Sequence, residues 1–359
     1  MNSYIYRPFN SIIPNCPVTI MRGKVHYDGE PGKDDPDDEG MTLVATTNND
    51  GWGSVKNLDL MTEEVFPMPY FLSLRYLTIL DGHCYALEEH LDADRADELW
   101  QKQQKEHPRD PFTAYVVGTA PFGGVAVWLR GRARSVLLHW LKAKETEFNE
   151  IEQARYAWTK EAEEYEVISR EELENDMQQF TYRYVACEEH WDWETLKWKE
   201  YDDEDPYYDD LDVDSIEDHR TDGTFNYLRG DDSQQRYHTA GKPDRITVRW
   251  HAGKAEYMAH FWLSKSMVTA FFNHFFQMSP DGSADILLRL DPDLRAFQLA
   301  LRSENHPKAY IIPWHAYQLI VFKDGEEHFK SRNYQLADGQ WGWIYTKPKE
   351  QKEKATENP

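Results

Sequence analysis

Apolar and polar positions along the chain follow the spacing of short β-strands in several places. The most regular stretch is Val125–Leu129, which is apolar throughout and follows the glycine pair Gly123–Gly124. Glycine tolerates backbone angles that other residues avoid, and a strand that is apolar on both faces is usually covered on both. We therefore expect a tight turn that leads into a buried strand, with Trp128 and Leu129 shielded from water.

A hairpin is predicted upstream of this strand. Residues 70–80 are rich in aromatic and branched side chains, which favours a strand. Asp81–Gly82 is a typical hairpin turn, and residues 84–88 then form the return strand.

Three helices are predicted around these strands. Asp92 is placed to cap a helix over 93–105, with its apolar residues on one face. Residues 143–164 are rich in Ala, Glu and Lys, and residues 169–178 begin with the capping-box pattern of Ser169.

A later part of the chain repeats the order of these elements. Pro243–Trp250 aligns with Pro69–Tyr76, so that Arg249 matches Arg75. The other anchors pair Tyr257 with Tyr85, Leu263 with Leu91, Ser264 with Asp92, Asp285–Leu290 with Val125–Arg130, and Arg295–Leu301 with Arg134–Trp140. The repeat predicts the α+β class, with two similar units that are each an antiparallel sheet with packed helices. Chance similarity of two amphipathic segments is the alternative.

The pattern divides the chain into five parts. They are N-terminal strands with an acidic loop (1–66), a first α+β unit (67–187), an acidic aromatic linker (188–240), a second α+β unit (241–346) and a disordered tail (347–359). In the acidic loop, Asp35, Asp37 and Glu39 lack the closing glutamate of a calcium-binding hand, which favours a solvated loop.

The charge of the chain restricts its partners. The 359 residues carry a formal net charge of -24, which disfavours nucleic acid phosphates and anionic membrane surfaces. Such a charge suits a basic protein partner, or simply keeps the surface soluble through self-repulsion.

The cysteines and the N-terminus indicate the compartment. Cys16, Cys84 and Cys187 are far apart and odd in number, so they build neither a disulfide framework nor a zinc set. The N-terminus has no apolar run of signal-peptide length, and no window approaches the length of a membrane span. We expect a reduced, cytoplasmic protein.

Roughly half of the net negative charge lies between residues 188 and 222. A charge run of this kind is usually a solvated linker, but linkers are poor in aromatic residues and this one is not. Acids beside tyrosine and tryptophan also suit an interface with a basic partner. The candidate partner-binding residues are Trp198, Tyr201, Asp202, Asp203, Tyr207, Tyr208, Asp209 and Asp210. A calcium site at the alternating Asp210, Asp212 and Asp214 is disfavoured because no glycine turn follows.

No motif for catalysis, phosphate binding or a metal is found in the sequence. Glu188 and His190 would share one face of a strand, but a surface cluster explains them as well. His83–Cys84 suggests a thiol nucleophile, although a buried structural cysteine is the commoner case. We therefore predict no catalytic residue, cofactor or metal.

The strand and glycine motifs together resemble a bacterial family known only as a domain of unknown function (number 2931). They are Pro69, Arg75–Tyr76, Tyr85 and Gly123–Gly131, over about a third of the chain. The resemblance implies packing motifs rather than catalytic ones. Members of the family are frequently lipoproteins, and some look like immunity proteins against type VI secretion effectors; this chain lacks the lipoprotein signal.

The leading hypothesis is a non-enzymatic immunity protein that neutralises a secreted, basic toxin through its acidic, aromatic surface. The alternatives are an enzyme, such as a hydrolase, with a dispersed active site, and a scaffold protein.

Overall fold

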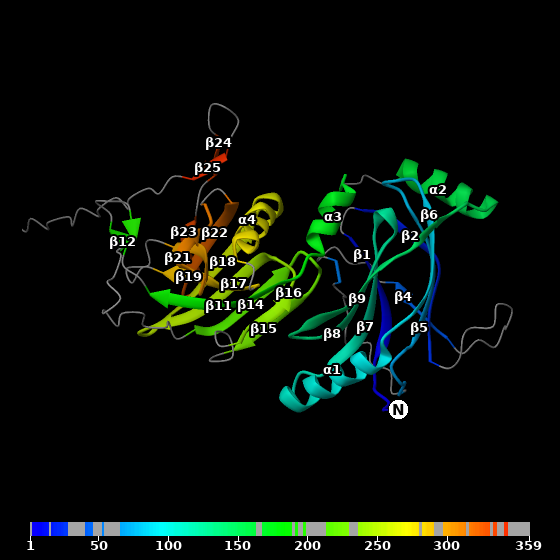
Figure 1. The fold of residues 1–359 in the computed structure, drawn as a ribbon, viewed down its shortest axis with the longest axis horizontal. Coiled ribbons are helices and arrows are strands. Elements are labelled where there is room, and N and C mark those ends of the chain that lie inside the picture. The colour runs from blue at the N-terminus through cyan, green and yellow to red at the C-terminus, as the bar shows by residue number, and fades with distance from the viewer. Residues whose placement is uncertain are drawn as a thin grey trace, which may run out of the picture.

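The computed structural model of the chain has two β-rich units side by side along its long axis (Figure 1). The residues that it describes are 2–13, 16–27, 40–45, 52–53, 65–162, 167–188, 191–192, 197–198, 213–229, 236–279, 282–290, 297–313, 316–330, 333–335 and 341–343.

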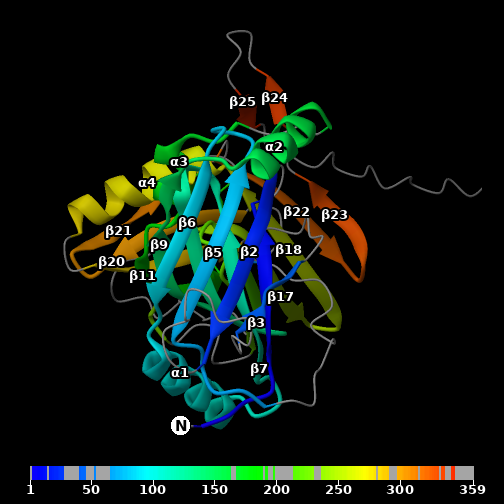
Figure 2. The same cartoon turned by 90° about the vertical axis from the view of Figure 1, so that its right-hand side faces the viewer.

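The first unit is made of two five-stranded sheets. Sheet 1 has the order β4-β1-β7-β8-β9, with β1 Arg7–Ile12, β4 Val44–Ala45, β7 Phe112–Thr119, β8 Gly124–Gly131 and β9 Ser135–Lys142. Sheet 2 has the order β10-β6-β5-β2-β3, with β2 Val18–His26, β3 Met41–Thr42, β5 Phe71–Thr78, β6 Cys84–His90 and β10 Lys144–Thr146. Figure 2 looks at this unit from the side of β2, β5 and β6.

The second unit also has two main sheets. Sheet 3 has the order β16-β11-β19-β20-β21, with β11 Phe180–Glu188, β16 His238–Ala240, β19 Ser283–Leu290, β20 Phe297–Ser303 and β21 His306–Ile311. Sheet 4 has the order β15-β14-β17-β18-β22-β23, with β14 Val213–Arg220, β15 Phe225–Arg229, β17 Pro243–Ala252, β18 Ala255–Leu263, β22 Tyr317–Lys323 and β23 Glu326–Lys330. Two small hairpins pair β12 Trp191–Asp192 with β13 Lys197–Trp198, and β24 Asn333–Gln335 with β25 Trp341–Trp343.

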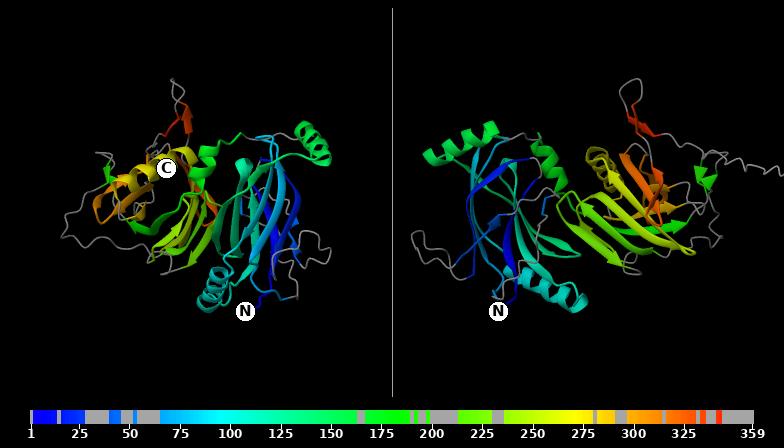
Figure 3. Two further views of the ribbon diagram at one scale, coloured as in Figure 1. Left: turned by 45° about the vertical axis from the view of Figure 1, so that its right-hand side comes forward. Right: turned by 180° about the vertical axis from the view of Figure 1, so that it is seen from behind.

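The helices lie at the margins of the sheets (Figure 3). They are α1 Ala93–Glu106, α2 Glu150–Ala162, α3 Arg170–Asp176 and α4 Lys265–Met278, with a short 3₁₀ turn η1 Pro121–Gly123. The cap of α1 is confirmed, because Asp92 accepts a hydrogen bond from the Arg95 amide, and so is the capping box at Ser169. The helix predicted over 143–164 is shorter than expected, because β10 occupies its first turn.

The prediction of an α+β fold with packed helices is wrong, because the protein is β-rich. In each unit the core is built mainly from the side chains of two sheets, and one helix adds to it: α1 with Ala96 and Trp100, and α4 with Val268, Phe272 and Phe275. The repeated pattern of hairpin and helix did not include β1, β2 and β14, which complete these sheets, although β1 and β2 fall in the range predicted to hold N-terminal strands. Residues 213–229, within the range predicted as a linker, form β14 and β15.

The two units share a connectivity. In the first, β1 pairs in parallel with β7; in the second, β11 pairs in parallel with β19. Tyr76 faces Tyr85 across β5 and β6, and Trp250 faces Tyr257 across β17 and β18. The strand Asp285–Leu290 therefore corresponds to β7 and not, as aligned from sequence, to Val125–Arg130 in β8. Short apolar strands look alike in sequence, and only their pairing separates them.

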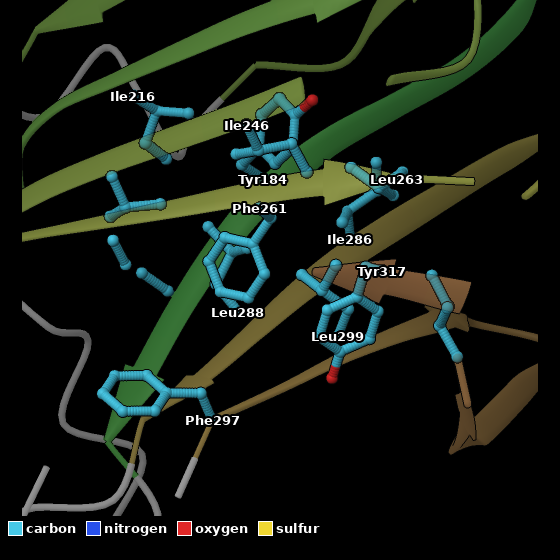
Figure 4. Close-up of a cluster of buried hydrophobic side chains, with 14 of the residues drawn as sticks. Tyr184, Ile216, Ile246, Phe261, Leu263, Ile286, Leu288, Phe297, Leu299 and Tyr317 are labelled. Atoms are coloured by element: carbon cyan, nitrogen blue, oxygen red, sulfur yellow. The ribbon is translucent and has the colours of Figure 1, made fainter. Parts of the chain in front are cut away.

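The strand after the glycine turn is buried as predicted. Trp128 and Leu129 are both 0% exposed, and they point to opposite faces of β8. Leu129 belongs to the core between sheets 1 and 2, whereas Trp128 joins a separate cluster on the outer face of sheet 1. Figure 4 shows the corresponding core of the second unit, where Phe261, Leu288 and Leu299 come together from three strands.

A substitution at the turn tests why glycine is needed there. Gly123 has φ 77°, and a Cβ atom would lie 2.6 Å from the carbonyl oxygen of Ala143. We expect Gly123→Ala to lower the free energy of unfolding by about 2–3 kcal/mol, since it adds a steric clash to backbone strain. Gly282→Ala is the control, because Gly282 has φ 72° but nothing within 4 Å of the added carbon. Equal losses in urea titrations of the two variants would contradict the role of the clash.

Candidate functional site

The two units meet at the outer face of sheet 1, where polar groups cross between them. The indole Nε1 of Trp128 donates to the carbonyl oxygen of Asp222 at 3.1 Å, and the amide of Phe225 donates to Ser135 Oγ at 2.9 Å. The Arg130 guanidinium lies 4.3 Å from the centre of the Phe225 ring. The turn between β14 and β15 is thus held against the first unit.

The side chain of Asp222 organises this turn from inside. Its Oδ1 accepts from the amide and the hydroxyl of Thr224, at 2.9 and 2.6 Å. Its Oδ2 accepts from Gln179 Nε2 at 2.7 Å and from the Gly241 amide at 2.9 Å. Asp222 is 0% exposed, and these four hydrogen bonds compensate for the burial of its carboxylate.

A buried lysine lies beside it. Lys242 is 0% exposed, and its ammonium donates to the carbonyl oxygen of Asn175. Burial lowers the pKa of Lys242 to about 8, while Asp176 and Asp222 act against that shift. Burial also raises the pKa of Asp176, whose Oδ2 lies 3.3 Å from Lys265 Nζ. These contacts tie the end of α3 to the second unit.

A second ionic cluster lies within the second unit. Arg220 Nη2 lies 2.9 Å from Asp218 Oδ2, which also accepts from Tyr184 Oη at 2.8 Å. The same guanidinium nitrogen lies 3.0 Å from His238 Nε2. Burial, followed by the Arg220 charge, lowers the pKa of His238 to about 4, so the imidazole is neutral at pH 7 and accepts this hydrogen bond.

Chemically, the two clusters hold the fold together. The side chains of Asp218 and Arg220 are 0% and 4% exposed, and they form an ion pair with each other. The two charges therefore compensate each other inside the protein. Within the described ranges, no group of three or more His, Cys, Asp or Glu side chains is placed to hold a metal ion.

The pKa of His238 predicts how stability depends on pH. An imidazole with a pKa of about 4 in the fold and 6.5 when unfolded makes the unfolded state bind more protons between these values. The free energy of unfolding should therefore increase as the pH rises from about 4 to 6.5, and decrease as the pH is lowered through the same window. We expect His238→Gln to remove that rise, about 3 kcal/mol, in urea titrations. His251→Gln, at a histidine side chain that is 57% exposed, is the control and should keep the wild-type slope.

Most of the partner-binding residues predicted from the sequence lie outside the described part of the chain. Tyr201, Asp202, Asp203, Tyr207, Tyr208, Asp209 and Asp210 are outside the described residues. Trp198 lies in β13, but its side chain is not described, and neither are the side chains of Glu188 and His190. The candidate calcium residues Asp35, Asp37 and Glu39 also fall outside the described ranges.

The candidate thiol, Cys84, is a buried residue of β6. It is 0% exposed, and burial raises its pKa, which disfavours the reactive thiolate. Its neighbour His83 turns to the surface, where Nδ1 lies 2.8 Å from Glu145 Oε1. The two side chains therefore do not act as a nucleophile and base.

A half-open groove of about 690 Å³ runs along the N-terminal segment and α1. Its walls include Ile5, Val65, Trp100 and Phe112. Tyr4 is the one titratable side chain among the described lining residues, and burial raises its pKa. The described lining thus mixes apolar side chains with amides and hydroxyls rather than forming a set of acids and bases.

Sequence reasoning missed Asp218, Asp222 and Lys242, each 0% exposed and the most buried charged residues among those that the structure describes. Asp218 and Asp222 were not singled out because they belong to the acidic stretch 188–222, and a run of charged residues predicts a solvated segment. The turn signal Asp222–Gly223 between residues of β14 and β15 was available and would have indicated a hairpin.

The fold and the contacts between the two units define the structural class of the protein. It is a β-rich protein of two units, and the buried charges described above support its structure. Residues 11–186 match the model of a family described as "Protein of unknown function (DUF2931)". This match confirms the resemblance to that domain of unknown function. No curated protein and no solved structure matches the chain. In the described part of the chain, no helix is long and apolar enough to cross a membrane.

Proposed function

We propose that the protein is a non-enzymatic binding protein that neutralises a secreted bacterial toxin, as an immunity protein of a type VI secretion system does. The observation that carries this proposal is the charge. Of the net -24, roughly half lies between residues 188 and 222, among tyrosines and tryptophans. An inhibitor needs only a complementary surface, and acidic charge speeds its encounter with a basic toxin.

The arrangement of the described charged groups supports a binding role. The interior clusters around Asp218 and Asp222 are internally hydrogen-bonded, and the groove beside α1 has a single titratable lining residue among those described. The partner in this proposal is a basic protein, and cytoplasmic localisation forms part of the same proposal.

Co-expression tests the proposal directly. The product of the adjacent gene is expressed alone and together with this protein, and growth and complex formation are measured. The proposal expects rescue of growth and a stable complex that elutes as one species. Absence of both rescue and complex would remove it.

The acidic segment makes a kinetic prediction for a confirmed partner. Changing Asp202, Asp203, Asp209 and Asp210 to Asn should slow association by about tenfold at low salt, because exposed charges steer encounter. Tyr207→Ala and Tyr208→Ala should instead speed dissociation, because aromatic anchors govern the lifetime of a complex. Surface plasmon resonance at two salt concentrations measures both rates.

A matched control removes four acids from the first unit: Glu89, Asp94, Glu98 and Glu106, all exposed. It changes the net charge equally but should slow association less, because steering depends on where the charge lies. Unchanged rates in all segment variants would mean that the segment is only a solvated linker.

A further inference from the structure

The outer face of sheet 4 carries arginines, histidines and aromatic side chains together with carboxylates. On this face, which turns away from the core, lie Glu217 and His219 of β14, Arg245 and Arg249 of β17, and His260 and Trp262 of β18. We call these six residues the sheet-4 outer face. The same face also carries two exposed carboxylates near one end, Glu256 of β18 and Asp214 of β14, which lies 2.6 Å from His251.

The strand register brings these side chains together. Arg245 lies opposite Trp262, Thr247 opposite His260, and Arg249 opposite Met258. The His260 ring lies 5.3 Å from the Trp262 ring and 5.7 Å from that of Phe322. Trp262 is 38% exposed, and among the described elements no helix is seen over this face (Figure 3).

The equivalent place in the first unit is occupied by a helix. There Arg75 of β5 binds the carboxylate of Glu152 in α2 with two hydrogen bonds, of 2.5 Å from Nε and 2.7 Å from Nη2. The same guanidinium donates to Thr146 Oγ1 at 3.2 Å and to the carbonyl oxygen of Glu147 at 2.9 Å. The side chain of Glu152 is only 2% exposed, so this ion pair seats the helix on the sheet.

Glu152 also caps the helix that carries it. Its Oε2 accepts from the Asn149 amide at 2.9 Å, and Asn149 Oδ1 accepts from the Glu152 amide at 2.9 Å. The carboxylate that meets Arg75 therefore belongs to the first turn of a helix, in a capping-box arrangement. Figure 2 shows α2 crossing one end of sheet 2.

Arg249 occupies the position in sheet 4 that Arg75 occupies in sheet 2, but no helix carboxylate like that of Glu152 binds it among the described residues. Each arginine precedes the aromatic residue, Tyr76 or Trp250, that faces a tyrosine on the next strand. Among the described residues, the ion pair of Arg249 is with Glu217 Oε2, 4.0 Å away, and Glu217 is itself 30% exposed. After β22 the chain continues into β23, where the first unit has α2 after β10.

We propose that the sheet-4 outer face is a docking surface for an acidic helical segment of a partner protein. A carboxylate in the first turn of that helix binds Arg249, as Glu152 binds Arg75. Trp262 and Phe322 supply the apolar contact that anchors such a helix. At Arg249 the partner carboxylate competes with Glu217 of the same face, whose Oε2 lies 4.0 Å away. A nucleic acid is disfavoured, since its many phosphates would meet only two arginines on a strongly acidic protein.

This surface is independent of the acidic segment in the proposed function. The probe is a synthetic peptide of residues 146–162, with acetylated and amidated ends, titrated into the full-length protein by isothermal calorimetry. We expect saturable binding at up to about 1 mM peptide, since a short isolated helix is only marginally stable. Arg249→Ala should weaken binding about tenfold, and so should Glu152→Gln in the peptide, because each removes one side of a charge-assisted pair.

The two changes combined should weaken binding little more than either one, because they break the same contact. Trp262→Ala should weaken binding several-fold, whereas Arg109→Ala, an equal change of charge at an exposed residue of the first unit, should leave it unchanged. Circular dichroism checks that each variant is folded.

Three results would overturn the proposal. They are the absence of binding to the wild-type protein, binding that Arg249→Ala does not weaken, and binding of a single-stranded oligothymidine that competes with the peptide at this face. The second result would place the peptide on the first unit, by exchange with α2.

Discussion

Asp218→Ala is expected to lower the free energy of unfolding by about 3–5 kcal/mol. The substitution leaves the buried Arg220 guanidinium without its carboxylate, 2.9 Å away in the native protein. It also removes the acceptor of the Tyr184 hydroxyl, which lies in the same core. An uncompensated charge of this kind costs much more than the loss of a surface ion pair. Urea titration followed by circular dichroism measures the effect.

Asp214→Ala is the matched control on the same strand. Asp214 also has an ion-pair partner, because its Oδ2 lies 2.6 Å from His251 Nδ1, but its side chain is 49% exposed. Its removal should cost less than about 1 kcal/mol, because water replaces the lost partner. If both variants lose the same stability, the burial of the Asp218 cluster is not what matters.

The buried charges lie where the two units meet and where β14 completes sheet 4. Asp218 and Arg220 belong to β14, and Asp222 to the turn that follows it. A buried ion pair contributes little net stability compared with apolar packing, but its partners have to be in register to avoid a large penalty. We infer that this part of the chain is specified by polar contacts more than by hydrophobic pattern.

Local structure could be predicted from the sequence wherever a short stretch determines it. The buried strand after Gly123–Gly124, the hairpin at Asp81–Gly82 and the capped start of α1 are all present. Each depends on backbone preferences or on alternation within a few residues. The helix over 143–164 was overextended, because Lys144–Thr146 pairs with β6 and sheet pairing overrides helix propensity.

The fold class is set by strand pairs that are far apart in the sequence, and a local pattern of apolar and polar residues does not reveal them. The parallel pairs β1 with β7 and β11 with β19 join strands far apart in the chain. The repeat was visible at Tyr76 and Tyr85, but its later alignment was displaced by one strand, because β7 and β8 have similar apolar patterns. The interior carboxylates were missed for a related reason, because some of their partners, such as Tyr184 for Asp218 and Gln179 for Asp222, are far away in the sequence.

Trp128→Ala is expected to lower the free energy of unfolding by about 3–5 kcal/mol and to loosen the contact between the units. Trp128 is 0% exposed, and its ring lies 5.2 Å from that of Trp52 in an edge-to-face arrangement. Removing it leaves a large cavity on the outer face of sheet 1, and the carbonyl of Asp222 loses its indole donor. Trp158→Ala is the control, because Trp158 is 70% exposed on α2 and its loss should cost less than about 0.5 kcal/mol.

Hydrogen exchange separates loss of packing from loosening of the junction. The amides of Phe225 and Tyr227 donate to Ser135 Oγ and to the carbonyl oxygen of Ala133, both in the first unit. If Trp128 holds the units together, these two amides should exchange faster in Trp128→Ala, by more than amides within the sheet-4 core, because local opening then needs less energy than global unfolding. Equal acceleration throughout the second unit would mean that the side chain contributes only to global stability. Unchanged exchange at both amides would show that the backbone contacts keep the junction closed without it.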